Sequence, residues 1–339
     1  SGTGAVYFRR EWDGGRVLKA DAFVTRSLFD LWSNFTFFLA DENFGDEIQQ
    51  HDSRLQQGVN AQLIRPHTLF GGRALLTAGA SGQAFQTNVG LYPSIGRNPN
   101  RAFVSRIDLT DCPSNGNPDV PGLSDGFNTS CFLLTSADAR VTNVAGYVQQ
   151  AVDLFGGHLH LEGGLRYDYF RFSVDDKIRP RFSGAEGAGR FQPKATVAYM
   201  PSDRFPATLH FNYGRGISSQ DARGVVQRPE SPKVATTDFY QLGTSHNYKR
   251  LSLTADLFLI DNSNQQVYIP DDGSIEFAGP SRAYGFEVKN SVRLMRQLTF
   301  NGGLTRVMNA FFRGTSPRVY VDSAPHTVAN AALTLTDWH

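Results

Sequence analysis

The stretch HLHLEGGLRYDY, residues 158–169, decides the fold. Its chemistry alternates at every second position. One face carries the apolar and aromatic side chains with one glycine: Leu159, Leu161, Gly163, Leu165, Tyr167 and Tyr169. The opposite face is mostly charged or polar: His158, His160, Glu162, Gly164, Arg166 and Asp168. A period of 2 over this length predicts one long β-strand with two chemically distinct faces.

The same alternation recurs along the whole chain, for example at 207–213 and 251–259. About thirteen such segments can be recognised. They are centred near residues 7, 24, 58, 79, 146, 164, 195, 211, 241, 257, 288, 303 and 332. No segment carries a helical period over about ten residues or more. The chain is therefore predicted to be all-β.

The connections between these segments alternate in length. Short ones hold turn-forming residues, as in Asp13-Gly14-Gly15 and Phe155-Gly156-Gly157, and the turn near 65–72 is expected to be intermediate. The long connections are expected at 38–50, 87–136, 177–190, 220–234, 270–281 and 312–325. Short turns at one end and long loops at the other predict a section of an antiparallel up-and-down β-barrel, rather than a Greek-key sandwich or a propeller.

The polar face indicates the surroundings of this barrel. His, Glu, Arg and Asp seldom fill a dry core, whereas a water-filled lumen accepts them. The apolar face then meets lipid, and Tyr and Phe at the strand ends are typical of an interfacial girdle. The net charge of +1 excludes a strongly basic nucleic-acid-binding protein. No G-x-S-x-G, P-loop or H-E-x-x-H motif supports an enzyme.

The sequence contains two cysteines, Cys112 and Cys131, in one polar stretch rich in turn formers. Such a loop is a poor place for a buried thiol and a good one for a disulfide, which implies an oxidising compartment. We therefore expect a Cys112–Cys131 disulfide. Two free thiols are the alternative.

A series of short motifs resembles the TonB-dependent outer-membrane receptors. In chain order they are GGLRYD at 163–168, PKATVAY at 193–199, FNYGRGISS at 211–219, FYQLG at 239–243, LFLID at 257–261, SRAYGFE at 281–287 and APHT at 324–327. Each motif is weak alone, but their order and spacing together are specific. The resemblance covers nearly the whole chain and is looser before about residue 140.

This resemblance implies a 22-stranded barrel that encloses an N-terminal plug. Residues 1–339 would supply part of the barrel domain, without the plug and the last strands. It further implies a bacterial outer-membrane protein in contact with lipid, energised by TonB and inner-membrane proteins through the missing plug. The ligand would be a small scarce nutrient, first of all a ferric siderophore. No cofactor and no nucleic-acid partner is expected. A passive porin or diffusion channel, or an adhesin or structural barrel, is the alternative.

Ligand contacts are expected in the long loops, because Arg offers planar, multidentate donors to an anionic or chelated ligand. The candidates are Tyr92, Arg97, Arg101, Arg223, Arg228 and Asp271.

The polar residues expected to face the lumen, and the plug of the complete receptor, are His158, His160, Glu162, Arg166 and Asp168. A metal bound by the two histidines and Glu162 is the alternative for three of them. No third histidine lies nearby in the sequence, so lumen-facing polar side chains are the preferred interpretation.

Overall fold

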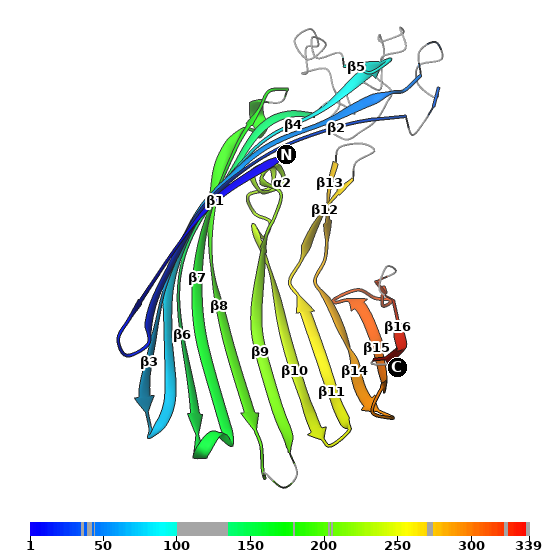
Figure 1. Cartoon of the computed structure of the whole chain (residues 1–339). Coiled ribbons are helices and arrows are strands. Elements are labelled where there is room, and N and C mark those ends of the chain that lie inside the picture. The colour runs from blue at the N-terminus through cyan, green and yellow to red at the C-terminus, as the bar shows by residue number, and fades with distance from the viewer. Residues whose placement is uncertain are drawn as a thin grey trace.

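The computed structural model describes residues 1–34, 37–38, 43, 45–99, 135–178, 180–202, 204, 206–269, 274–321 and 325–336. Its main body is one antiparallel sheet of 14 strands in the order β1-β2-β3-β4-β6-β7-β8-β9-β10-β11-β14-β15-β16, with the short β5 paired to β4. Figure 1 shows this sheet as a curved, open wall. Within the described residues, no strand pairs with the outer edge of β1 or of β16.

The strands of the wall confirm every predicted segment. They are β1 (Gly2–Trp12), β2 (Arg16–Ser33), β3 (Ile48–Leu69), β4 (Gly72–Ile95), β6 (Thr135–Leu154), β7 (Leu159–Asp176), β8 (Gly184–Tyr199), β9 (Ala207–Ser219), β10 (Val234–Tyr248), β11 (Leu251–Asn262), β14 (Ser281–Arg293), β15 (Leu298–Phe312) and β16 (Thr327–Leu335). The partner of β4 is β5 (Asn98–Pro99). The longest strand, β4, has 24 residues, far more than the usual five or six in globular sheets.

The connections alternate as predicted, with tight turns at one end of the sheet, the turn end, and long connections at the other, the loop end (Figure 1). Two of the expected loops are shorter than predicted, because β4 continues through Tyr92 to Ile95 and β8 already begins at Gly184. The turn near 65–72 is shorter than expected. Phe70 and Gly71 both have positive φ, 51° and 78°, which is the backbone of a two-residue hairpin turn. As a result β3 continues straight to Leu69.

Three short elements were not predicted. The helix α2 (Ala222–Gln227) and the strand β13 (Ser274–Ala278) lie within stretches expected to be loops, whereas the strand β12 (Gln265–Ile269), which pairs with β13, ends just before the expected loop 270–281. Each is too short to show a recognisable period. The described residues also contain two single 3₁₀ turns, Phe155–Gly157 and Pro180–Phe182. No helix in the described part of the chain is long and apolar enough to cross a membrane.

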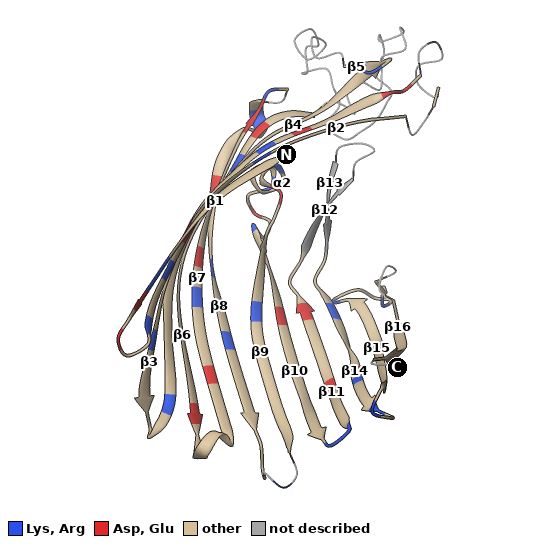
Figure 2. Cartoon of the chain, in the orientation of Figure 1, with Lys and Arg blue, Asp and Glu red and all other residues tan. Residues whose placement is uncertain are grey.

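The two faces of the wall differ as the alternation predicts, and charged residues occur along its strands, β7 to β11 among them (Figure 2). On β7, Leu165, Tyr167 and Tyr169 are 46%, 42% and 47% exposed. Aromatic rings pair across neighbouring strands on this face, with the centroids of Tyr167 and Phe191 4.6 Å apart. The alternate residues of β7 point to the concave side of the sheet, where Phe172 is fully buried.

The buried core is small and lies on the concave side near the loop end. Phe172 and Val174 of β7 pack there with Val225 of α2 and with Val234, the first residue of β10. Figure 1 shows α2 inside the curve of the sheet. A short segment between β9 and β10 thus covers part of the concave face.

Candidate functional site

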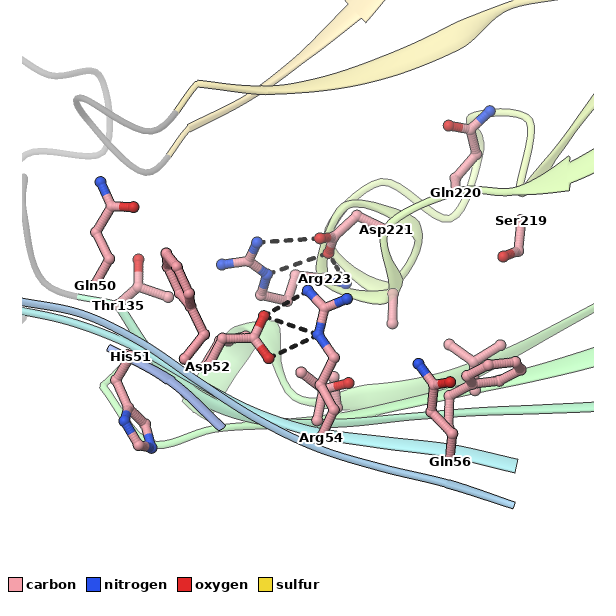
Figure 3. Close-up of a pocket in the computed structure, with 18 residues that line it drawn as sticks. Gln50, His51, Asp52, Arg54, Gln56, Thr135, Ser219, Gln220, Asp221 and Arg223 are labelled. Atoms are coloured by element: carbon pink, nitrogen blue, oxygen red, sulfur yellow. Dashed lines mark hydrogen bonds and ion pairs between the residues drawn. The ribbon is translucent and has the colours of Figure 1, made fainter. Parts of the chain in front are cut away.

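A cavity of about 470 Å³ lies on the concave face, between the upper parts of β3, β4 and β6 and the segment that leads into α2. Its polar lining comes mainly from Gln50, Asp52, Arg54, Gln56, Asp221 and Arg223 (Figure 3). Phe29 of β2 and Phe85 of β4 add aromatic surface. The cavity therefore joins residues of β3 to a segment more than 150 residues later in the chain.

The segment around α2 is ordered by its own sequence. Asp221 caps the helix, because its carboxylate accepts a hydrogen bond of 2.8 Å from the backbone N–H of Arg223. The helix ends at Gln227; the N–H of the next residue, Arg228, donates to the carbonyl of Gly224, and Pro229 follows. A residue before proline is disfavoured in helical conformation, which explains this end.

Apolar contact holds α2 against the wall. Val225 is 1% exposed and Ala222 is 5% exposed. Both belong to the cluster that includes Phe172 and Val174. Fully burying a side chain such as valine contributes about 1.5–3 kcal/mol, so this contact fixes the position of the charged residues beside it.

Two ion pairs lie next to each other in the cavity (Figure 3). The guanidinium of Arg54 donates through Nε to both carboxylate oxygens of Asp52, at 2.7 and 2.9 Å. The guanidinium of Arg223 donates to Asp221 through Nε and Nη2, each at 3.1 Å. Arg54 is also attracted electrostatically by the carboxylate of Asp221. The four charges therefore form one electrostatic unit across strand and helix.

The Asp221 carboxyl stays ionised in spite of its surroundings. Burial raises its pKa, but the charge of Arg223 and the hydrogen bonds from Arg223 and Gly224 outweigh burial, so that the pKa of Asp221 lies below its usual range. A charged Asp221 orients the Arg223 guanidinium, just as Asp52 orients that of Arg54. Oriented guanidinium groups are suited to carboxylates and other planar anions.

The structure places the predicted ligand residues in different surroundings. Arg223 lines the cavity. Tyr92 is 6% exposed, and its hydroxyl lies 3.1 Å from Ser136 Oγ, outside the cavity lining. The guanidinium of Arg97 lies over the ring of Trp32, at 6.0 Å from its centroid. Arg228 is exposed at the end of α2.

Arg101 and Asp271, together with Cys112 and Cys131, lie outside the described residues. Ligand contact by the six candidate residues stays a prediction. So does the Cys112–Cys131 disulfide.

The residues expected to face the lumen occupy β7 and the turn before it. His158 Nδ1 lies 2.8 Å from the carbonyl oxygen of Met200, and His160 Nδ1 lies 2.8 Å from Asp153 Oδ1. Glu162 follows at the next alternate position of the same strand. These contacts tie the histidines to neighbouring strands near the turn end. Among the described residues, no group of three or more His, Cys, Asp or Glu could hold a metal ion.

Arg166 and Asp168 belong to a larger polar network on the concave face. Asp168 is 2% exposed and accepts hydrogen bonds from Arg166 Nε at 2.7 Å, Gln192 Nε2 at 2.6 Å and Asn143 Nδ2 at 3.1 Å. Arg166 also reaches Ser81 Oγ at 3.2 Å. The network thus joins β4, β6, β7 and β8.

Sequence reasoning missed Asp52 and Arg54, because it looked for the ligand site in the long loops and not on the strands. A signal was nonetheless present. An acid and an arginine stand two positions apart at Asp52 and Arg54, as they do at Arg166 and Asp168. On a strand this spacing puts both side chains on one face, and here each such pair is hydrogen-bonded.

Comparisons with known proteins agree with this architecture. The family model described as TonB dependent receptor-like, beta-barrel matches residues 3–339. The solved structure of the ferric citrate transporter FecA in the unliganded form is 14% identical with a TM-score of 0.73, over 98% of this chain and 46% of that chain. The ferric yersiniabactin uptake receptor FyuA from Yersinia pestis is 11% identical with a TM-score of 0.68, over 98% and 46%.

The ferripyoverdine receptor of the outer membrane of Pseudomonas aeruginosa, bound to ferripyoverdine, is 14% identical with a TM-score of 0.68, over 99% of this chain and 44% of that chain. The chain thus spans somewhat less than half the length of these structures. At such identities the likeness shows the fold. A comparison with curated proteins found no match.

Proposed function

Because the chain belongs to the TonB-dependent receptor family, as a section of its outer-membrane β-barrel, we propose that the complete protein is an active-transport receptor for a scarce nutrient. The nutrient is a ferric siderophore in this proposal. It binds at the loop end, which faces the outside of the cell, and moves inward with energy delivered by TonB and inner-membrane proteins. The barrel wall itself carries out no bond chemistry.

One observation carries the proposal, namely the cavity between the strands and α2. It combines two carboxylate-oriented guanidinium groups, Arg54 and Arg223, with amide side chains and the rings of Phe29 and Phe85. A ferric chelate presents anionic oxygens around a metal and often an apolar or aromatic backbone, and this lining is complementary to both. The similar solved structures, a ferric citrate transporter, a ferric yersiniabactin uptake receptor and a ferripyoverdine receptor, support the same class of ligand.

In the complete receptor, a plug domain rests against the concave face in this proposal. The network around Asp168 offers it polar partners on four strands. The plug then couples the ligand site at the loop end to TonB at the opposite side of the membrane.

Uptake of labelled ferric siderophores by cells that carry the full-length gene tests the transport proposal. Uptake should depend on the energising system of the inner membrane. Uptake that continues unchanged without this system would identify a passive channel instead. Growth restored only by cobalamin or a glycan would keep the transporter class and replace the ligand.

The ligand site is tested by a double variant, Asp221→Asn with Arg223→Gln. It removes the ion pair without leaving an unpaired carboxylate, and the apolar contacts of Val225 and Ala222 still hold α2 against the wall. Hydrogen bonds to charged groups contribute about 1.5–3 kcal/mol, so we expect affinity for the transported chelate to fall roughly 10- to 100-fold. Arg296→Gln, in an exposed turn at the far end of the sheet, is the matched control and should bind normally.

A further inference from the structure

The charges that line the cavity on the concave face cancel one another. The lining contains two arginines and two aspartates, joined as the ion pairs Arg54–Asp52 and Arg223–Asp221. His51 also belongs to the lining, but it points away from the two ion pairs (Figure 3), and its Nδ1 lies 2.7 Å from Asp30 Oδ1. The described lining of the cavity therefore offers no excess of positive charge to a ligand.

The two ion pairs present opposite charges to the cavity. In the strand pair the cation is the more accessible partner, because the side chain of Arg54 is 51% exposed and that of Asp52 is 21% exposed. In the helix pair the anion is the more accessible one, with Asp221 at 35% and Arg223 at 10%. A ligand thus meets one guanidinium and one carboxylate, which suits a molecule that has polar groups but no net charge.

The rest of the polar lining is uncharged. It consists of amide and hydroxyl side chains, among them Gln50, Gln56, Gln220, Thr135 and Ser219. Each amide both donates and accepts hydrogen bonds, so the lining can contact polar groups of a ligand without compensating a net charge. The cavity volume of about 470 Å³ lies in the range of small-molecule sites.

Ferric chelates differ in net charge according to their ligating groups. Three hydroxamates lose one proton each, so their complex with Fe³⁺ is neutral. Three catecholates lose two protons each, so their complex carries three negative charges. In this cavity such a trianion would lie beside two carboxylates and would lose hydration without an excess of cations to replace it.

We propose that the cavity selects ferric chelates without net charge, of the trihydroxamate type, and that Asp52 and Asp221 exclude trianionic chelates of the tricatecholate type. The donors of Arg54 contact the metal-bound oxygens one at a time, while the two carboxylates keep the charge of the site balanced. This selectivity rests on the proposed function, in which the transported nutrient is a ferric siderophore.

Calorimetric titration of the complete receptor at low salt tests this charge selectivity. The probes are the ferric complexes of a trihydroxamate and of a tricatecholate built on the same tripodal scaffold. The wild type should bind the neutral complex at least roughly tenfold more tightly than the trianion. Asp52→Asn should raise affinity for the trianion roughly tenfold, which corresponds to three charges about 8 Å from one carboxylate in water. Affinity for the neutral complex should change less than about threefold.

A second variant and a matched control separate charge from folding. Gln50→Lys adds a positive charge to the lining without altering either ion pair, and it should shift the preference in the same direction as Asp52→Asn. Asp175→Asn removes the same charge at the loop end, but on the convex face, where the side chain of Asp175 is 65% exposed. This control should leave both affinities unchanged.

Two results would overturn the charge selectivity alone. One is tighter binding of the trianion than of the neutral complex by the wild type. The other is a preference that neither Asp52→Asn nor Gln50→Lys changes. Binding of neither ferric complex would overturn the proposed function as well.

Discussion

Replacing Leu165 by arginine places a charge on the convex face of β7 at the depth where lipid is most apolar. The outward row of β7 runs from Leu159 to Tyr169, about 33 Å along the strand. With a tilt of about 40°, this row spans a height of about 25 Å, which equals the apolar band of an outer-membrane barrel. Leu165 stands one residue from the middle of the row and is 46% exposed. An arginine at the midplane costs about 2–4 kcal/mol, and we expect this loss for Leu165→Arg.

Urea-induced unfolding of the complete receptor in phospholipid vesicles measures this loss. Ser173→Arg introduces the same side chain on the same face of the same strand, but four residues beyond Tyr169 and opposite Arg140. It should therefore cost no more than about 1 kcal/mol. Glu162→Lys reverses a charge on the opposite face and should also be milder than Leu165→Arg.

The ranking of the three variants decides the outcome. If Ser173→Arg or Glu162→Lys destabilises the barrel as much as Leu165→Arg, the assignment of the convex face to lipid is wrong. A difference below about 1 kcal/mol would equally contradict the position of the midplane near Leu165.

Three further predictions concern the loop end. Val225→Ala removes two buried methyl groups and should weaken the docking of α2 by about 2 kcal/mol, which hydrogen exchange reports as a protection of residues 222–227 reduced roughly 30-fold; unchanged protection would contradict the packing. The pKa of Asp221 lies below its ordinary value of 3.8. The ionised carboxylate therefore stabilises the docking of α2 fully above pH 3.8, and this stabilisation is lost as the pH falls through the lowered pKa. The protection of residues 222–227, corrected for intrinsic exchange, should fall with it, and Asp221→Asn should abolish this acid sensitivity. Cys112 and Cys131 should appear as one linked pair in non-reduced peptide maps, and the bond should stabilise the loop by about 3 kcal/mol; alkylation of both thiols in the native protein would exclude it.

The sequence predicts the wall well because lipid and water impose a period of 2 on every strand. In β7, the residue type at each position from Leu159 to Tyr169 indicates the face to which its side chain points, and the segment centred near 257 is equally clear. The turn near 65–72 is shorter than the sequence predicts, because the period of 2 does not reveal that Phe70 and Gly71 adopt positive φ and reverse the chain in two residues.

The candidate site is harder to predict because its parts obey no common period. α2 has only six residues, and its position depends on contact with Phe172, which is distant in sequence. Asp52 and Arg54 sit on a strand and resemble any other pair on the polar face of the wall. Only the three-dimensional arrangement shows that β3 passes beside α2. Loop cations could be named from the sequence, but the strand residues that complete the cavity could not.

The great length of β4 affects how large particles and proteins from outside the cell first contact the receptor. On its convex side the last small apolar residue is Ala84, and the strand then continues from Gln86 to Ile95. This extension is about 30 Å long, and with the tilt of the wall it rises about 25 Å above the bilayer. Together with β3 it forms a raised edge of the wall on one flank, whereas β16 begins at Thr327, opposite Arg306 of β15, without a comparable extension at the loop end. An antibody, phage or toxin that approaches from outside would touch the raised ends of β3 and β4 well before it reached the lipid. This section of the barrel wall is therefore higher on the side of β3 and β4 than on the side of β16.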